Sequence, residues 1–358
     1  MRREVLLDMH RLRYNPYNGL YTFCLELGSA IAALEVPGMH FTYYVPKQKF
    51  GVFGNDQSYL RQRSIDKYYR FGTGRYHLWH VTTSLSWYRP FNRHTKNVFT
   101  LHDLSFLIEE KENVQRNKRL LRQMQQRVDR ADHITAISRF ALDFAQPYLD
   151  FGHTPTSIIY NGFRVKEFPA YTTPVYKPKS KFLFAIGLVQ PRKNFHVLPA
   201  LLQGNDYELV IAGLNHFDYA NTIREQAKLH GVEDRVKLIG AISEQDKYWL
   251  YKHCEAFVFP SIAEGFGMPA LEAMYFGKPV FLSTETSMPE IGGAVAYYFE
   301  HFEPSYMRQR FAEGMHHYHT TKPQEKIKAR AAQFSWAKAA GEYVEVYRSL
   351  LPHPRSLS

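Results

Sequence analysis

Short runs of β-branched and aromatic residues alternate with segments of helical length along this sequence, and this alternation limits the possible folds more than any other feature. Strands that alternate with helices form right-handed βαβ units, which build parallel sheets. The runs are more numerous than the ~10 strands that a single twisted sheet usually holds. The predicted strands are Glu4–Met9, His40–Val45, Leu78–Val81, Asn97–Leu101, His133–Ile137, Ser157–Tyr160, Phe182–Ile186, Glu208–Ala212, Arg235–Ile239, Ala256–Phe259, Pro279–Leu282 and Ala294–Phe299.

The strand pattern restarts after residues 164–180, a proline-bearing stretch that has the composition of a linker. We therefore predict an α/β protein with two doubly wound parallel-sheet domains that face each other across a cleft. The first domain is predicted to span residues 1–168 and the second residues 169–334. An amphipathic helix at residues 335–351 is expected to pack back on the first domain.

The composition favours a soluble globular protein, with 45% hydrophobic and 22% charged residues. It excludes a disordered chain, a collagen and a coiled coil. No apolar run approaches the ~18 residues that span a bilayer. The apolar stretch Val5–Leu7 is too short for the core of a signal peptide. Cys24 and Cys254 have neither metal-site nor redox spacing, so we expect a reduced, cytoplasmic protein.

Most of the formal net charge of +11 comes from the first 168 residues, and the densest cationic stretch lies between residues 116 and 130. Such a stretch attracts phosphates on nucleic acid, on anionic lipid or on a phosphorylated glycolipid. It predicts peripheral binding at the inner face of a membrane. The alternative is a helix face that only meets solvent. The sequence has no zinc-finger spacing and no RNA-recognition motif that would favour nucleic acid.

Residues 256–279, AFVFPSIAEGFGMPALEAMYFGKP, carry the strongest chemical pattern. A buried strand is followed by a loop with Gly265 and Gly267, and a helix begins near Pro269. The glycines let backbone N–H groups and the helix dipole approach an anion such as a diphosphate. Glu264 and Glu272 are placed to accept hydrogen bonds from hydroxyls at the two ends of one ligand, as in a nucleotide-sugar. The alternative is that both glutamates merely face water.

Further candidates follow other predicted strands. Gly187, Arg192 and Lys193 follow Phe182–Ile186, at the strand end where open α/β sheets bind ligands. The two cations there are suited to stabilise a departing diphosphate. In the first half, His102 and Asp103 follow Asn97–Leu101, Gly19 precedes the first helix, and His80 ends another strand. His102 and Asp103 are candidates for hydroxyl binding or acid–base work, and His80 and Asp103 are weak acceptor-side candidates. A structural histidine is the alternative for His80 and His102.

With these segments in view, the sequence resembles the retaining glycosyltransferases of family 4, also called glycosyl transferases group 1, which have the GT-B fold of two Rossmann-like domains. The most specific element is E-x7-E within EGFGMPALEAM. The further motifs are PRKN (191–194), FVFPS (257–261), GKPV (277–280), MPEIGG (288–293), TLHDL (100–104), AISRFA (136–141), IIYNG (158–162) and the final FSWAKAAGEYVEVYRSLL.

The resemblance implies a role for each matching residue. Glu264 would bind hydroxyls of the transferred sugar, and Glu272 the ribose of the nucleotide. Arg192 and Lys193 would hold the diphosphate, and His102 would lie near the donor sugar across the cleft. Gly19 would belong to the phosphate loop of the first domain. Backbone amides at Phe266, Gly267 and Met268 would contact sugar or phosphate, and Gly187 and Gly265 would also belong to the donor-binding site.

The implied reaction moves a hexose from a nucleoside-diphosphate sugar, such as GDP-mannose or UDP-glucose, to an acceptor hydroxyl during synthesis of polysaccharide, lipopolysaccharide or glycolipid. His102, Arg192, Lys193 and Glu264 would be catalytic. The sequence has no Asp-x-Asp element for a metal–diphosphate complex, so we expect no metal and no cofactor. Two alternatives stay open: a glycosidase that uses the two carboxylates, and a non-enzymatic basic protein that binds nucleic acid or membrane.

Overall fold

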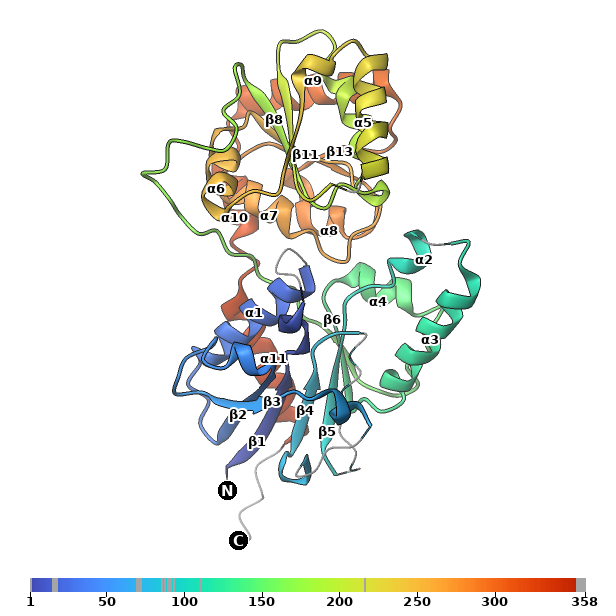
Figure 1. Cartoon of the computed structure of the whole chain (residues 1–358), viewed down its shortest axis with the longest axis vertical. Helices are drawn as coiled ribbons and strands as arrows, with labels where there is room; N and C mark the ends of the chain where they lie inside the picture. The colour runs from blue at the N-terminus through green and yellow to red at the C-terminus, as the bar shows by residue number, and fades with distance from the viewer. Residues whose placement is uncertain are drawn as a thin grey trace. The chain divides into compact units, whose positions relative to one another are not determined.

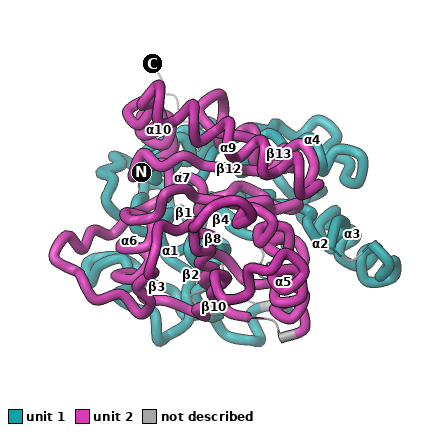
Figure 2. Tube along the Cα trace, turned by 90° about the horizontal axis from the view of Figure 1, so that it is seen from above, with its two compact units in different colours: residues 1–162, 335–358 teal, residues 163–334 magenta. Residues whose placement is uncertain are grey.

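The computed structural model describes residues 2–14, 19–68, 73–84, 86, 88, 92, 94–109, 111–215 and 217–351. The chain divides into two compact units, the first formed by residues 1–162 and 335–358 and the second by residues 163–334 (Figure 2). Each unit is an α/β layered structure around its own parallel sheet (Figure 1).

The sheet of the first unit has seven strands among the described residues, in the order β3-β2-β1-β4-β5-β6-β7, and every strand pair is parallel. Its central strands are buried on both faces because helices cover the sheet on both sides. The strands are β1 (Arg3–Asp8), β2 (Met39–Val45), β3 (Ser58–Arg61), β4 (Leu78–Val81), β5 (Lys96–Leu101), β6 (His133–Ala136) and β7 (Thr156–Ile158). The helices are α1 (Gly19–Ala32), α2 (Phe106–Glu109), α3 (Val114–Val128), α4 (Arg139–Ala145) and α11 (Trp336–Leu350).

Helix α11 returns the end of the chain to the first unit. Ser335 caps its N-terminus by accepting the Lys338 N–H. The Trp336 ring lies edge-on to Phe23 of α1, with centroids 5.7 Å apart. At Gly162, in the loop after β7, a Cβ would lie 2.1 Å from the Trp336 backbone nitrogen. This loop can therefore approach α11 so closely only with glycine at this position.

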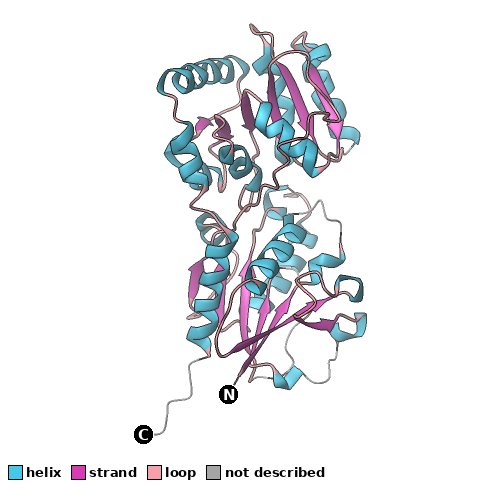
Figure 3. Cartoon of the chain, turned by 90° about the vertical axis from the view of Figure 1, so that its left-hand side faces the viewer, coloured by secondary structure: helices cyan, strands magenta, loops and turns pink. Residues whose placement is uncertain are grey.

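The sheet of the second unit has six strands in the described part of the chain, in the order β10-β9-β8-β11-β12-β13, again all parallel. Helices flank its strands in Figure 3. The strands are β8 (Phe182–Ile186), β9 (Glu208–Ala212), β10 (Val236–Gly240), β11 (Ala256–Phe259), β12 (Val280–Ser283) and β13 (Tyr297–Phe299). The helices are α5 (Phe217–Leu229), α6 (Glu244–His253), α7 (Met268–Tyr275), α8 (Met288–Gly292), α9 (Pro304–Thr321) and α10 (Gln324–Ala331).

The predicted strands are all present, and β3 is an additional one. The predicted domain boundary after residue 168 is wrong, because the second unit begins at Phe163. Residues 163–180 are not a free linker. They are tied to the second unit by two carboxylates: Asp246 accepts the Tyr171 hydroxyl at 2.7 Å and the Val175 N–H at 2.7 Å, and Glu208 accepts the Lys179 N–H at 2.6 Å. Within the described residues, no helix has the length and apolarity needed to cross a membrane.

Candidate functional site

Three loops meet at the carboxyl edge of the second sheet, after β8, β11 and β12. The carbonyl of Arg192, in the loop after β8, accepts the Ile262 N–H at 2.9 Å and the Ser261 hydroxyl at 3.0 Å, both from the loop after β11. Ser283, at the end of β12, donates its hydroxyl to the Ser261 carbonyl at 2.5 Å. These bonds hold the predicted cationic loop and the predicted glycine loop against each other.

Glu264 lies at the centre of this edge, with its side chain 10% exposed. Its carboxylate accepts hydrogen bonds from the Lys193 ammonium and from the Ser261 hydroxyl at 2.6 Å, and the Arg192 guanidinium lies 3.6 Å away. Burial by itself would raise the pKa of Glu264, but Lys193 and Arg192 hold the pKa below its ordinary value. Glu264 is therefore ionised at neutral pH.

Lys193 and Arg192 are fixed by the short helix Pro191–Lys193, which Pro191 begins. The Lys193 side chain is 7% exposed, and its ammonium lies 4.8 Å from the centre of the Phe259 ring, on β11. Arg192 donates to the Ala263 carbonyl at 2.8 Å. Gly187 has a φ of +152°, and a Cβ there would lie 3.2 Å from the Lys193 side chain. The four predicted residues of these two loops therefore form one cluster.

The glycine loop leads directly into helix α7. Gly267 precedes the helix with a φ of +111°, a conformation that a residue with a side chain rarely adopts. Gly265 and Phe266 are buried, and the Ser287 hydroxyl lies 2.8 Å from the Phe266 carbonyl. Met268 is the first residue of α7. The loop and the start of the helix thus have the backbone form that the sequence predicts for binding an anion.

Glu272 lies one turn into α7, with its side chain 14% exposed. Both of its oxygens have partners on α6: Oε1 accepts from the Lys247 ammonium at 3.0 Å, and Oε2 accepts from the Tyr251 hydroxyl at 2.9 Å. Sequence reasoning missed Lys247 and Tyr251. The available signal was their i, i+4 spacing, but nothing local pairs that segment with Glu272.

In the first unit, His102 and Asp103 follow β5 as predicted. His102 is buried, and its Nε2 donates to the Thr82 carbonyl at 2.8 Å, while its backbone N–H donates to the Ser84 hydroxyl at 3.0 Å. Burial lowers the pKa of His102 to about 4, so the ring is neutral at pH 7. Asp103 is half-buried and accepts the Ser105 N–H at 2.9 Å.

Gly19 is the first residue of helix α1 and is exposed. The preceding residues 15–18, which belong to the predicted phosphate loop, lie outside the described residues. Further along α1, Tyr21 accepts a hydrogen bond from the Lys49 ammonium at 3.0 Å. The donor-binding role of Gly19 stays a prediction.

The acceptor-side prediction for His80 does not fit the structure. His80 is fully buried in the first unit, and both ring nitrogens are engaged: Nδ1 with the Tyr347 hydroxyl at 2.7 Å and Nε2 with the Thr100 hydroxyl at 2.7 Å. Burial lowers its pKa to about 3. A ring that is enclosed and saturated with partners cannot contact a substrate, so His80 is a structural histidine that anchors α11.

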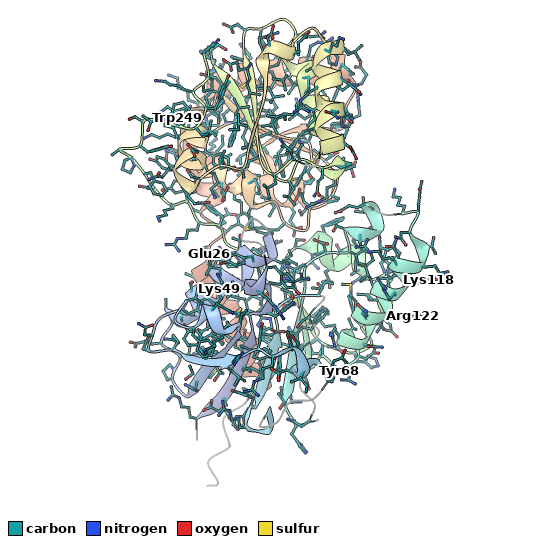
Figure 4. The ribbon with its side chains drawn as sticks, in the orientation of Figure 1. Glu26, Lys49, Tyr68, Lys118, Arg122 and Trp249 are labelled. Atoms are coloured by element: carbon teal, nitrogen blue, oxygen red, sulfur yellow. The ribbon has the colours of Figure 1, made fainter. Side chains whose placement is uncertain are left out.

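The cationic stretch forms helix α3, and its side chains separate into two groups. Lys118, Arg119 and Arg122 are exposed, and Figure 4 labels Lys118 and Arg122 along α3. Arg127 is buried and donates to the Ser86 carbonyl. The exposed cations are a surface feature, whereas Arg127 belongs to the interior. Over the described ranges, no three His, Cys, Asp or Glu side chains are grouped so that they would hold a metal ion.

Two family models match the sequence and divide it much as the structure does. The model for Glycosyltransferase Family 4 matches residues 23–167, and the model for Glycosyl transferases group 1 matches residues 174–314. The serotype-specific mannosyltransferase WbdA of Escherichia coli is 31% identical over 248 residues, which are 62% of this chain but only 29% of that relative. The O-antigen chain mannosyltransferase B of Escherichia coli is 25% identical over 327 residues, 81% of this chain and 84% of that protein.

Solved structures share the fold over nearly the whole chain. Sucrose-phosphate synthase from Thermosynechococcus elongatus superposes with a TM-score of 0.74 at 18% identity, covering 99% of this chain and 100% of that one. HepE from Anabaena, solved with UDP and glucose, has a TM-score of 0.71 at 17% identity and covers 97% and 100%. The GT-B fold predicted from the sequence is confirmed.

Proposed function

This chain belongs to family 4 of the glycosyltransferases, and on that premise we propose that it moves a hexose from a nucleoside-diphosphate sugar to an acceptor hydroxyl with retention at the anomeric carbon. The names of its relatives favour mannose as the sugar and O-antigen or a related polysaccharide as the product. GDP-mannose is therefore the first donor to test, and UDP-glucose the second.

The cluster of Glu264, Lys193 and Arg192 carries the proposal. Its two cations and one carboxylate have a net positive charge, at the sheet edge where α/β folds bind ligands. In the proposed step the bond between the anomeric carbon and the diphosphate oxygen breaks, and the acceptor oxygen bonds to that carbon from the same face. The acceptor proton passes to the departing phosphate oxygen. The cations stabilise the negative charge that grows there, and no protein nucleophile is needed.

The chemistry of Glu264 argues against the glycosidase alternative. Such an enzyme needs one carboxyl group that stays protonated near neutral pH and donates its proton to the leaving oxygen. Glu264 has a lowered pKa and lies against an ammonium, so it holds no proton to give. Glu272 already accepts hydrogen bonds at both oxygens. Both side chains are suited to accept hydrogen bonds from sugar hydroxyls.

A panel of nucleotide-sugars tests the function. We expect one of them to stabilise the folded chain by about 2.7 kcal/mol when it is present at 100 times its Kd, and so to raise the Tm. We expect Lys193→Met to remove that shift and Glu325→Gln, at an exposed carboxylate of α10, to leave it unchanged. The stabilising donor should then release nucleoside diphosphate only when an acceptor is added. Hydrolysis of a glycoside without a nucleotide, or tight binding of nucleic acid alone, would favour one of the alternatives.

The proposed reaction is metal-independent, because Arg192 and Lys193 supply the positive charge that a divalent cation supplies to a diphosphate elsewhere. We expect turnover to persist in excess EDTA. Loss of turnover in EDTA that Mg²⁺ or Mn²⁺ restores would contradict this part of the proposal.

The exposed cations of α3 are proposed to hold the enzyme at an anionic membrane or to a phosphorylated lipid acceptor. Each Lys or Arg near an anionic surface contributes about 1 kcal/mol, so reversing Lys118, Arg119 and Arg122 to Glu is expected to weaken liposome binding by at least ~100-fold. A matched control reverses three exposed lysines of the second unit, Lys228, Lys252 and Lys326. If both variants lose liposome binding equally, or if neither loses it, a docking role of α3 is not supported.

A further inference from the structure

Lys247 joins the candidate site although no motif marks it. Its ammonium lies 3.0 Å from Oε1 of Glu272 and 3.1 Å from Oε2 of Glu244, and its side chain is 20% exposed. Burial by itself would lower the pKa of Lys247, but Glu272 and Glu244 raise it above its ordinary value. Lys247 therefore stays protonated across the physiological range and gives Glu272 a permanent cationic partner.

Tyr251 fixes the other oxygen of Glu272. Its ring is buried edge-on to Phe184, with centroids 5.0 Å apart, so the hydroxyl has little freedom to move. Burial and the neighbouring Glu272 raise its pKa, so the hydroxyl keeps its proton and donates it. The Pro269 carbonyl lies 3.1 Å from the same hydroxyl, and the Glu272 carboxylate is the nearer acceptor, at 2.9 Å.

Lys247 and Tyr251 are one helical turn apart on α6 and hold the Glu272 carboxylate in one orientation. A carboxylate has about four lone-pair positions, of which this grip uses one on each oxygen. Each oxygen can therefore accept one more hydrogen bond, and the side chain is 14% exposed. Two acceptor positions on one carboxylate match the two adjacent hydroxyls of a ribose.

The charge of Lys247 has a second consequence. An isolated carboxylate beside a diphosphate would repel it, because charges a few ångströms apart interact strongly near a protein surface. The paired ammonium offsets the negative charge of Glu272. The carboxylate then accepts hydroxyl hydrogens without opposing the binding of the phosphates.

We propose that Lys247 is a positioning residue that holds Glu272 ready for the two ribose hydroxyls of the donor nucleotide. This inference rests on the proposed function and goes further by naming a residue that sets the preference for ribose. A purely structural bridge between α6 and α7 would affect every ligand alike, so ribose and dideoxyribose nucleotides distinguish the two roles.

The experiment measures by calorimetry the Kd of the whole chain for UDP and for GDP, and then for the 2′,3′-dideoxy form of the tighter one. We expect the wild type to bind the ribose form at least about tenfold more tightly, since hydrogen bonds to a charged group are lost with the hydroxyls. Lys247→Met should bind the two forms with nearly equal Kd. Lys247→Arg should restore most of the preference, and Glu244→Gln, which leaves the bond to Glu272 in place, should keep it.

The outcomes separate this inference from the function on which it rests. If the wild type binds neither UDP nor GDP and no nucleotide-sugar of the panel raises its Tm, the function and the inference both fail. If the wild type prefers ribose and Lys247→Met keeps that preference, only the inference fails. The same holds if Lys247→Met weakens the binding of both nucleotides by an equal factor, which is the result expected of a structural bridge.

Tyr251→Phe provides a second variant, because it removes one hydrogen bond to Glu272 and keeps the buried ring. It should reduce the preference for ribose.

Discussion

The ion pair between Glu264 and Lys193 allows a quantitative prediction. Both side chains are almost enclosed, and removing one partner of a buried pair leaves the other as an uncompensated charge, at a cost of about 3–5 kcal/mol. Glu264→Gln keeps an oxygen that still accepts from Ser261, and Lys193→Met leaves Arg192 3.6 Å from the carboxylate. Each single variant is therefore expected to lower the free energy of unfolding by about 3 kcal/mol, near the lower end of that range.

The double variant should lose less stability than the two single variants lose together. Once one partner is absent, removing the other takes away a buried charge that has lost its nearest counter-charge, so we expect about 3–4 kcal/mol for both changes and a coupling of about 2–3 kcal/mol. For a unit of this size 1 kcal/mol corresponds to about 2–4 °C in Tm, so each variant should lower the Tm of that unit by roughly 6–12 °C.

Differential scanning calorimetry of the four proteins gives the cycle directly. Glu325→Gln, which breaks an exposed pair with Lys328, is the control and should shift the free energy of unfolding by less than about 0.5 kcal/mol. If the two single-variant costs add to within ~0.5 kcal/mol in the double variant, the two side chains act independently and the predicted coupling is absent.

Three further predictions concern stability. Because the folded-state pKa of Glu264 lies below its ordinary value of 4.5, its contribution is present above about pH 4.5 and is lost as the pH falls; the Tm difference between the wild type and Glu264→Gln should shrink on acidification, and a pH-independent difference would contradict this. His80→Ala should cost about 2–4 kcal/mol in urea unfolding, because two buried hydroxyls lose their partner; a cost under ~0.5 kcal/mol would count against an anchoring role. Gly213→Ala should disrupt the second unit, because its Cβ would lie 1.8 Å from the Gly187 carbonyl oxygen. Gly341→Ala, in open space on α11, should instead stabilise the chain by about 0.5–1 kcal/mol. Circular dichroism and Tm measurements compare the two variants, and equal effects would contradict the steric argument.

Strand identity was predictable because most strands are central and buried, and such strands appear in the sequence as continuous apolar runs. β3 was missed for the opposite reason. It is a four-residue edge strand, SYLR, with no residue fully buried, so no apolar run marks it. The boundary at residue 168 was misplaced because the prolines of 164–180 indicate a linker, while the carboxylates that tie this segment down belong to distant elements.

The candidate site was predictable where one local segment holds its residues. Glu264, Gly267 and Glu272 lie within one loop and helix. Lys193 follows the end of a predicted strand, which places it at the carboxyl edge of the sheet. His80 and His102 both lie at strand ends and give the same signal in sequence. Both rings are buried, but only His80 bonds to α11, through the Tyr347 hydroxyl more than 250 residues along the chain, and sequence alone does not reveal that partner. Lys247 was missed for a similar reason, since its partner lies on another helix.

Hydrogen–deuterium exchange of the whole chain, with and without the nucleotide-sugar that raises its Tm most, shows whether the loops after β8 and β11 bind the donor. We expect slower exchange in the peptides that cover residues 187–194 and 261–272 of the second unit. Unchanged exchange in those two segments, with protection only elsewhere in the chain, would contradict donor binding by these loops.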